Sequence, residues 1–457
     1  MGDRISLITL EGEKREKQEA RESIAVTYDF GARLAERVSK GTALEIEKLQ
    51  RLDRLIKWGE NLTYEQAFSG MCHVLSATNV HFFNLCWGEF DRDARILREK
   101  ALAAGVAFIQ LMAAKEALRS LKPEEIAGMV SAALMDTVFR FSIPRVVETC
   151  GMGGDIGFRV DGTIQKTINV STLSAIVLSA VGLPVIKHGS YSNTSAVGST
   201  EAIERFGAHT SMDSAKEVER IWSACGFCYF DAHWCKTIHD LSHLLMVETI
   251  NHIIGPMSLS VNPQTEVNKV MGVNEKVHPS VVARAYTILH QRKVQRVGGV
   301  IVVGGLDDRG YMINPSDVDA FRAHCIIDEV SPYATVCSVA YQGSFLGDFI
   351  LYPEDFGVSI DPETIKVSNT ADAIQQANIT ALRGENDALV DYLAMNAALG
   401  LFAERFVAGG DAVIDNQLNR AHLQTCYQEC REAITSGRAW EKLVLYVSAS
   451  GGTLSLL

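Results

Sequence analysis

The sequence predicts an α/β protein: a small N-terminal α-helical domain followed by a large α/β domain with a central, mostly parallel sheet. Residues 61–145 carry helix start signals and apolar residues at helical spacing. From residue 146 onward, short β-branched runs alternate with helical segments, which is typical of parallel strands joined by crossover helices. We find no internal repeat and no low-complexity linker in the sequence, so the large domain is predicted to extend over residues 146–457.

The N-terminal region is predicted to be helical in two parts. Residues 1–60 are expected to form a partly helical extension, because a highly charged start is followed by helical periodicity. Thr63, with Gln66 three residues later, is a capping box that starts the first helix of the small domain. Pro123 starts another helix, since proline suits a first helical turn and the two acids that follow it suit the helix dipole.

Five short apolar runs are predicted as strands of the large domain. They are Val146–Thr149, Pro184–Ile186, Phe227–Asp231, Gly299–Val303 and Ile365–Val367. Helices are expected between them, among them the segments 214–224 and 238–254.

The composition places limits on partners and location. The chain is 47% hydrophobic and 21% charged, as ordinary globular proteins are. Its net charge of −12 argues against nucleic acid or a membrane surface as a partner. An anionic ligand must therefore meet a local positive site or a metal ion. Ten cysteines spread along a chain without a signal peptide predict free thiols and a cytoplasmic location.

The stretch from Cys150 to Glu204 predicts a cradle for phosphate and diphosphate. Its glycine loop, GMGGD at 151–155, lets backbone N–H groups approach an anion. A helix start at 169–172 gathers unpaired N–H donors at a positive dipole end, and Lys187 adds a charge that suits phosphate. The residues predicted to bind the phosphorylated ligand are Gly151, Gly153, Gly154, Asp155, Thr167, Asn169, Ser171, Thr172, Lys187, Ser195 and Ser199.

The order of these motifs resembles the anthranilate phosphoribosyltransferase family and, more distantly, the thymidine phosphorylases. The family's GTGGD, N-x-S-T and KHG motifs correspond to the residues 151–155, 169–172 and 187–189. Its FNLLGPLTNP and PEDFG segments are similar to NHIIGPMSLSVNP at 251–263 and PEDFG at 353–357. The resemblance covers most of the chain.

This resemblance implies transfer of a phosphoribosyl group from 5-phosphoribosyl-1-diphosphate with Mg²⁺ as cofactor. It implies that Lys187 and His188 are the catalytic side chains, and that helices from about 233 to 255 join the small domain. It also implies a homodimer formed by small-domain helices. The family's metal-binding Asp-Glu pair has two candidates here, Asp307-Asp308 and Asp328-Glu329. We favour Asp328 and Glu329, together with Ser171, because their interval to Pro353 is close to that of the family.

The acceptor side departs from the family pattern. KHGNR becomes KHGSY at 187–191, and the arginine-bearing V-R-R-E-L-G-I-R-T becomes LSHLLMVET at 241–249. An anthranilate carboxylate would lose its charged partner, so we expect a neutral aromatic amine or heterocycle as the acceptor. The predicted acceptor pocket consists of His188, Ser190, Tyr191, His243 and His252.

Two alternatives and two insertions remain open at the sequence level. The chain could run similar chemistry as a nucleoside phosphorylase, or it could be a relative that binds ligand without catalysis. Relative to the family, the chain has extra residues at 156–166, beside the predicted diphosphate loop, and at 306–327. The first could be a lid or a surface loop, and the second is predicted to be polar and helical at 315–324.

Overall fold

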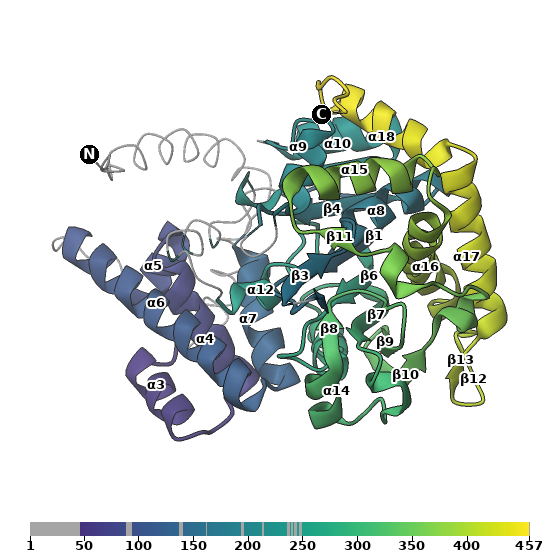
Figure 1. Ribbon diagram of the computed structural model, residues 1–457. Coiled ribbons are helices and arrows are strands. Elements are labelled where there is room, and N and C mark those ends of the chain that lie inside the picture. Colours follow the sequence, from purple (N-terminus) through teal and green to yellow (C-terminus); the bar gives the residue numbers. More distant parts are fainter. Residues whose placement is uncertain are drawn as a thin grey trace.

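The computed structural model describes residues 46–87, 94–136, 140–160, 162–192, 196–212, 214–234, 238, 241, 245 and 249–456. Most of the predicted extension, with Ser195 and His243 of the predicted sites, lies outside this set. Figure 1 shows a helical body of early helices beside a larger body in which helices cover a twisted sheet. The predicted fold class is confirmed.

The helical body begins inside the predicted extension. Its helices are α3 (Leu49–Lys57), α4 (Tyr64–Leu75), α5 (Val80–Trp87), α6 (Ala94–Arg119) and α7 (Pro123–Met135). Helix α4 starts after the predicted capping box, in which Thr63 Oγ1 accepts from the Gln66 N–H at 3.3 Å and Gln66 Oε1 accepts from the Thr63 N–H at 3.0 Å. A buried ion pair of 2.5 Å, Lys115 to Glu125, ties α6 to the start of α7.

The main sheet is mixed, with a parallel centre. Its strands are β1 (Arg145–Gly151), β4 (Val185–Gly189), β5 (Phe227–Asp231), β6 (Glu266–Gly272), β7 (Val297–Leu306), β8 (Cys325–Ile327), β9 (Thr335–Tyr341) and β10 (Ser344–Leu351). Their order is β10-β9-β7-β6-β1-β4-β5, with β8 beside β7. The five strands from β5 to β7 are parallel, whereas β8, β9 and β10 are antiparallel to their neighbours.

The sheet is buried on both faces, as parallel sheets are. All ten residues of β7 are buried, and its side chains alternate between two cores. Ile301 and Val303 join the core beneath α8 (Val170–Ala180), α16 (Asp387–Phe402), α17 (Arg420–Thr435) and α18 (Arg438–Ala449). Val300 and Val302 join the core shared by α13 (Pro279–Gln291) and the helical body. Helix α12 (Asn251–Ile254) also packs into this second core.

The remaining elements are short or lie at the periphery. They are α9 (Ser199–Arg205), α10 (Ala215–Cys225), α14 (Val318–His324), α15 (Ala371–Leu382), β12 (Val413–Ile414), β13 (Gln417–Leu418), the 3₁₀ turns η1 (Ala232–Trp234), η2 (Gly310–Met312), η3 (Pro353–Phe356) and η4 (Pro362–Thr364), and the π-helical turn η5 (Ala403–Val407). Of the helix expected at 238–254, the structure describes only a few residues besides α12.

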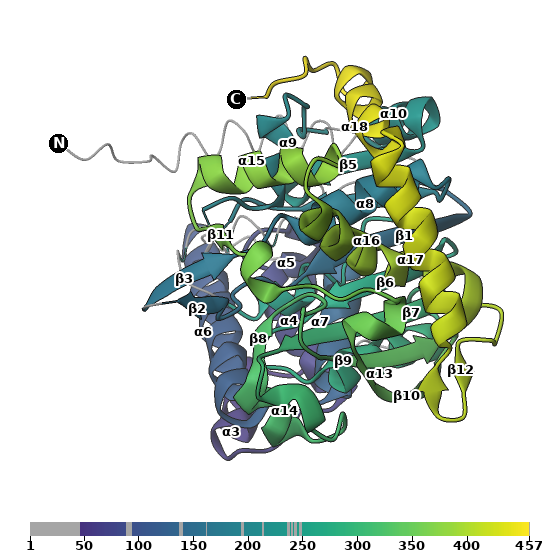
Figure 2. The same cartoon turned by 45° about the vertical axis from the view of Figure 1, so that its right-hand side comes forward.

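The insertion at 156–166 is a β-hairpin. Its strands β2 (Phe158–Val160) and β3 (Thr163–Lys166) form a small sheet with β11 (Val367–Ser368), seen at the left of Figure 2. The strand expected at 365–367 is therefore two residues long and pairs with this hairpin instead of the main sheet. Val367 lies opposite Lys166 in that pairing.

Glycines end two neighbouring central strands where another segment crosses them. A Cβ at Gly272 would lie 1.4 Å from the backbone oxygen of Asp328, and a Cβ at Gly151 would lie 2.2 Å from its carboxylate. The chain order runs from β1 to β4 and β5 on one side and returns to β6 on the other. Such a reversal leaves a crevice at the carboxyl ends of the strands, where open α/β sheets bind ligands.

We expect Gly272→Ala to lower the free energy of unfolding by ~3 kcal/mol, because its methyl group would displace the backbone at Asp328. Gly410→Ala is the control: its φ is +83° but a Cβ there meets nothing within 4 Å, so only the left-handed strain of ~1 kcal/mol applies. Urea denaturation followed by circular dichroism measures both. Equal losses of unfolding free energy in the two variants would contradict the proposal that only glycine fits at position 272, where the backbone of Asp328 passes.

Candidate active site

A cavity of about 290 Å³ opens at the carboxyl ends of β1, β4 and β6. It is lined by the glycine loop after β1, the start of α8, the turn after β4, the segment 249–256 and the pair Asp328-Glu329. Segments far apart in the sequence therefore meet at one edge of the sheet. Among the predicted donor residues in the described part of the chain, all except Thr172 line this cavity.

The glycine loop has a backbone that only glycine adopts without strain. Gly153 and Gly154 have φ values of +70° and +68°. The Gly153 N–H donates to Asp328 Oδ2 at 2.7 Å, and the Gly153 carbonyl accepts from Asn274 Nδ2 at 2.9 Å. Met152, which replaces the family's threonine, is 7% exposed and adds no polar group to the loop. The loop is thus fixed from both sides by side chains.

Helix α8 begins at Val170 with Asn169 as its N-cap residue, as predicted. Asn169 and Asn378 exchange two hydrogen bonds of 2.8 Å, which fixes the position of the helix start. Ser171 and Ser174 line the cavity, and the Ser174 hydroxyl is buried without a partner among the described residues. Thr172 is fully buried outside the cavity, where its hydroxyl lies 3.1 Å from Ser199 Oγ.

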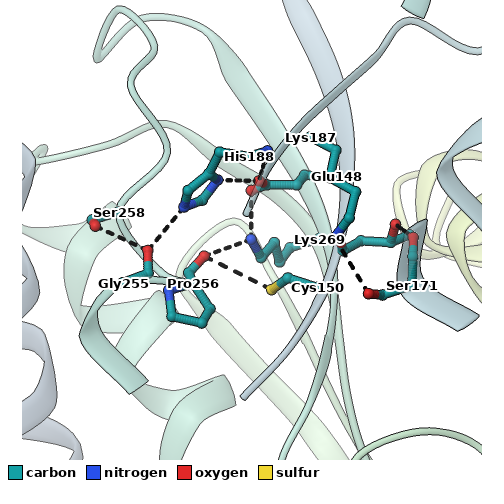
Figure 3. Close-up of polar contacts among 10 residues, drawn as sticks. Glu148, Cys150, Ser171, Lys187, His188, Gly255, Pro256, Ser258 and Lys269 are labelled. Atoms are coloured by element: carbon teal, nitrogen blue, oxygen red, sulfur yellow. Dashed lines mark hydrogen bonds and ion pairs between the residues drawn. The ribbon is translucent and has the colours of Figure 1, made fainter. Parts of the chain in front are cut away.

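Lys187 reaches the cavity from β4 as a buried cation. Its side chain is 1% exposed, and its Nζ donates to the Thr149 carbonyl at 2.7 Å and to Ser171 Oγ at 3.3 Å (Figure 3). Burial lowers the pKa of Lys187 to about 8. Both hydrogen-bond partners are neutral, so an anion at the α8 start would stabilise the ammonium form.

The Asp328-Glu329 pair concentrates negative charge at the cavity wall. Burial, with the nearby Asp155, raises the pKa of Asp328 to about 6. Burial, with the neighbouring Asp328, raises the pKa of Glu329 to about 8. The Glu329 carboxylate also accepts hydrogen bonds from Thr167 Oγ1 and, at 2.9 Å, from Tyr392 OH. Lys166 neutralises only Asp155, at 2.7 Å.

These carboxylates fit a divalent cation that is shared with a ligand. No three His, Cys, Asp or Glu side chains form a ready metal site in the described residues. Mg²⁺ is usually held by one or two carboxylates, waters and substrate phosphates, so two acidic side chains beside a phosphate cradle suit it. The rival Asp307 instead binds Arg309 at 2.9 Å and His324 at 3.0 Å and does not line the cavity.

A buried charge network lies behind the cavity (Figure 3). The Glu148 carboxylate of β1 contacts His188 Nδ1 of β4 and Lys269 Nζ of β6, each at 2.5 Å. His188 Nε2 lies 3.0 Å from the Gly255 carbonyl, and Lys269 donates to the Pro256 carbonyl at 2.7 Å. Burial opposes ionisation of Glu148, but its two partners lower its pKa to about 2. The network therefore joins three central strands to the 255–256 turn.

Comparison with known proteins shows what the chain is similar to. The glycosyl transferase family, a/b domain, matches residues 144–318. The anthranilate phosphoribosyltransferase of Leptothrix cholodnii is 27% identical over 373 residues, which cover 79% of this chain and 93% of the relative. That of Ignicoccus hospitalis is 29% identical over 339 residues, or 72% and 84% of the two chains. Over most of its length the chain is thus similar in sequence to anthranilate phosphoribosyltransferases.

Solved structures of the family share the fold. The anthranilate phosphoribosyltransferase from Saccharomyces cerevisiae, in complex with PRPP and Mg, superposes with a TM-score of 0.62 over 88% of this chain and 98% of that one, at 19% identity. The Thermus thermophilus enzyme gives a TM-score of 0.59, covering 88% and 99%, at 22% identity. The family model and the sequence relatives, together with this shared fold, identify the chain as a phosphoribosyltransferase.

On the acceptor side of this phosphoribosyltransferase, the predicted residues make specific contacts. Tyr191 OH donates to Glu204 Oε1 at 2.9 Å, and the Ser190 hydroxyl donates to the Tyr191 carbonyl at 3.2 Å. His252 lines the cavity with its Nε2 2.9 Å from Glu116 Oε1. His188 also lines the cavity, but both its ring nitrogens face internal partners. Its predicted contact with an acceptor stays a prediction.

Several residues of the site were missed at the sequence level. Glu148, Lys269 and Glu116 carry no motif signal, and their importance follows only from the neighbours that the fold gives them. Asn251 lies in a segment that matches the family, but nothing in the sequence gave its side chain a role at the cavity. One signal could have pointed to Glu148 and Lys269. Each is a single charged residue inside a buried strand, and a buried charge needs a partner.

We expect Glu148→Gln to lower the free energy of unfolding by ~3 kcal/mol, because it leaves the Lys269 ammonium buried beside a neutral amide. The double variant Glu148→Gln with Lys269→Met should lose less than the single variant, since it removes both charges. Arg51→Gln, at an exposed ion pair, is the control and should change little. Chemical denaturation measures all three, and a double variant that is no more stable than Glu148→Gln alone would contradict the pairing.

Proposed function

We propose that this phosphoribosyltransferase moves the 5-phosphoribosyl group of 5-phosphoribosyl-1-diphosphate to a small aromatic amine or heterocycle other than anthranilate. The supporting observation is one cavity that gathers the glycine loop, the start of α8, Lys187 and the Asp328-Glu329 pair. Backbone amides, a helix N-terminus and a lysine together suit a phosphorylated ligand better than any one of them alone.

In this proposal the diphosphate lies against Gly153, Gly154 and the first turn of α8. Lys187 faces it from β4, and Thr167, Asn169 and Ser199 line the same wall. Asp328, Glu329 and Ser171 would hold Mg²⁺, which when bound neutralises negative charge on the diphosphate. Ser174, whose hydroxyl has no partner among the described residues, offers this wall one more donor.

The reaction is a substitution at the anomeric carbon of the ribose. A bond forms between the acceptor nitrogen and this carbon, and the bond from the carbon to the diphosphate oxygen breaks with its electron pair. Positive charge develops on the sugar ring and negative charge on the diphosphate. The fixed amides of the glycine loop and the Lys187 ammonium stabilise the second of these, and removal of one such donor typically costs ~3 kcal/mol. The acceptor amine needs mainly to be held in place.

The exclusion of anthranilate rests on the missing cation. The segment 241–249 contains no lysine or arginine, and a carboxylate without such a partner loses about 1.5–3 kcal/mol. Tyr191 and His252 offer an aromatic acceptor neutral surfaces and ring contacts instead. His243, which was predicted beside them, lies outside the described residues.

We expect Lys187→Ala and Asp328→Asn each to weaken the binding of 5-phosphoribosyl-1-diphosphate with Mg²⁺ by roughly 10- to 100-fold, because each removes a charged contact. Isothermal titration calorimetry measures this. Asp308→Asn is the matched control from the rival acidic pair, and it should bind the donor as the wild type does. A loss in Asp308→Asn with wild-type affinity in Asp328→Asn would move the metal to the other pair.

The identity of the product distinguishes this proposal from the two alternatives. Release of diphosphate from 5-phosphoribosyl-1-diphosphate in the presence of an aromatic amine is the expected result. Phosphate-dependent cleavage of nucleosides would instead identify a nucleoside phosphorylase. Donor binding without turnover of any acceptor would identify a binding protein.

We further propose that the chain forms a homodimer through α6. The segment Arg98–Arg119 of this helix has a mean hydropathy of 1.5, and only 39% of its most apolar window is buried. Leu102 and Leu118 are 41% and 79% exposed. Exposed apolar side chains along a helix of this kind are typical of an interface. Sedimentation should give twice the mass of the chain, and Leu118→Glu should shift it towards the monomer. A monomeric wild type would rule the dimer out.

A further inference from the structure

The segment 249–256 forms one wall of the cavity. The chemical groups on this wall differ from those of the diphosphate cradle. Thr249, Asn251, His252, Gly255 and Pro256 of this segment line the cavity. The donor wall offers N–H groups and a lysine, whereas this wall offers oxygen atoms and an imidazole. The groups on this wall therefore indicate which kind of acceptor the cavity suits.

Asn251 presents an unsatisfied amide here. The residue is 8% exposed, and its Oδ1 accepts no hydrogen bond from the residues that the structure describes. Its backbone is fixed: the Asn251 N–H donates to Thr249 Oγ1 at 3.2 Å, and the Gly255 N–H donates to the Asn251 carbonyl at 2.8 Å. Buried carbonyl oxygens nearly always have a partner, so this one suits a ligand N–H group.

A buried carboxylate, that of Glu116, lies behind the same wall and contacts His252. The His252 Nε2 lies 2.9 Å from Glu116 Oε1, and the two side chains are 9% and 1% exposed. Arg322 donates to the Glu116 backbone carbonyl at 3.1 Å, not to its carboxylate. The Glu116 carboxylate is thus in contact with His252, and its negative charge favours ligand N–H groups over a ligand carboxylate at this wall.

Positive charge is scarce at this end of the cavity. Residues 237–268 contain no lysine or arginine. Within the described lining, the only such residues are Lys166 and Lys187. Lys166 pairs with Asp155, and Lys187 bonds to Thr149 and Ser171 on the donor side.

We propose that the acceptor is an aromatic amine that carries a second N–H group, in an amide, amidine or amine substituent, and no anionic group. Asn251 Oδ1 and the Glu116–His252 pair recognise that second group. The inference rests on the proposed transfer from 5-phosphoribosyl-1-diphosphate and narrows its acceptor class. It also makes Asn251 and Glu116 specificity residues, a role that the sequence alone gives to neither.

Three probes that differ in one substituent test the inference on the full chain. They are 2-aminobenzoate, 2-aminobenzamide and 2-aminobenzylamine, which present an anion, a neutral N–H group and a cationic N–H group. Calorimetric titration into the protein with bound 5-phosphoribosyl-1-diphosphate and Mg²⁺ gives affinities, and diphosphate release gives kcat/KM. We expect the amide or the amine to exceed 2-aminobenzoate at least tenfold in affinity.

The possible outcomes are distinct. If the donor does not bind, the proposed function fails before the acceptor is tested. If the donor binds and 2-aminobenzoate binds as well as or better than the other two, the inferred acceptor class is wrong. If the donor binds and none of the three probes binds, the assignment of this wall to an aromatic amine is wrong.

Two variants test whether Asn251 and Glu116 determine the preference among the three probes. Asn251→Leu should reduce the ratio of amide to benzoate affinity towards one, and Glu116→Gln should reduce the preference for the amine. Both should keep the donor affinity of the wild type, since neither residue lies at the donor wall. A purely structural role would weaken all three probes equally, so unchanged ratios in both variants would overturn the inference.

Discussion

The structure depends on how the carboxylate of Glu148 is held in the middle of the sheet. A carboxylate there is costly unless charged partners meet both its oxygens, and the penalty for an unpaired buried ion is several kcal/mol. His188 and Lys269 supply these partners from the two strands that flank β1. Because both also bind carbonyls of the 255–256 turn, the same interaction fixes one wall of the cavity.

Around this fixed centre, the cavity separates two kinds of chemistry. At the donor wall, backbone N–H groups, a helix start and Lys187 favour negative charge, while Asp328 and Glu329 hold raised pKa values that a divalent cation would relieve. At the other wall, an amide oxygen and a histidine–glutamate pair favour N–H groups. A transferase that joins an anionic donor to an uncharged or cationic acceptor needs this separation, because each ligand is then drawn to its own wall.

Local chemistry explains what the sequence could reveal. The glycine loop, the helix start at Asn169 and the position of Lys187 follow from residue types at short spacing, and the structure brings them together as predicted. The choice of Asp328 over Asp307 depended on an interval to another motif; Asp328 lines the cavity and Asp307 does not, while their metal-binding role stays a prediction. What the sequence could not reveal are pairs made by strand order. His188 is 40 residues from Glu148, Lys269 is 121 residues from it, and Glu116 is 136 residues from His252.

The contacts of the two insertions also become visible only in the folded structure. The hairpin at 156–166 places Lys166 on Asp155 at the donor wall, and it is anchored by the pairing of β3 with β11 and by the Gly157 N–H, which donates to the Ile326 carbonyl at 2.8 Å. The insertion at 306–327 contains α14, whose Arg322 donates to the carbonyl of Glu116 in α6 and to the hydroxyl of Ser120, which follows α6. Since Glu116 pairs with His252, the second insertion supports the opposite wall. The two lengthened segments of this chain therefore support opposite walls of the same cavity.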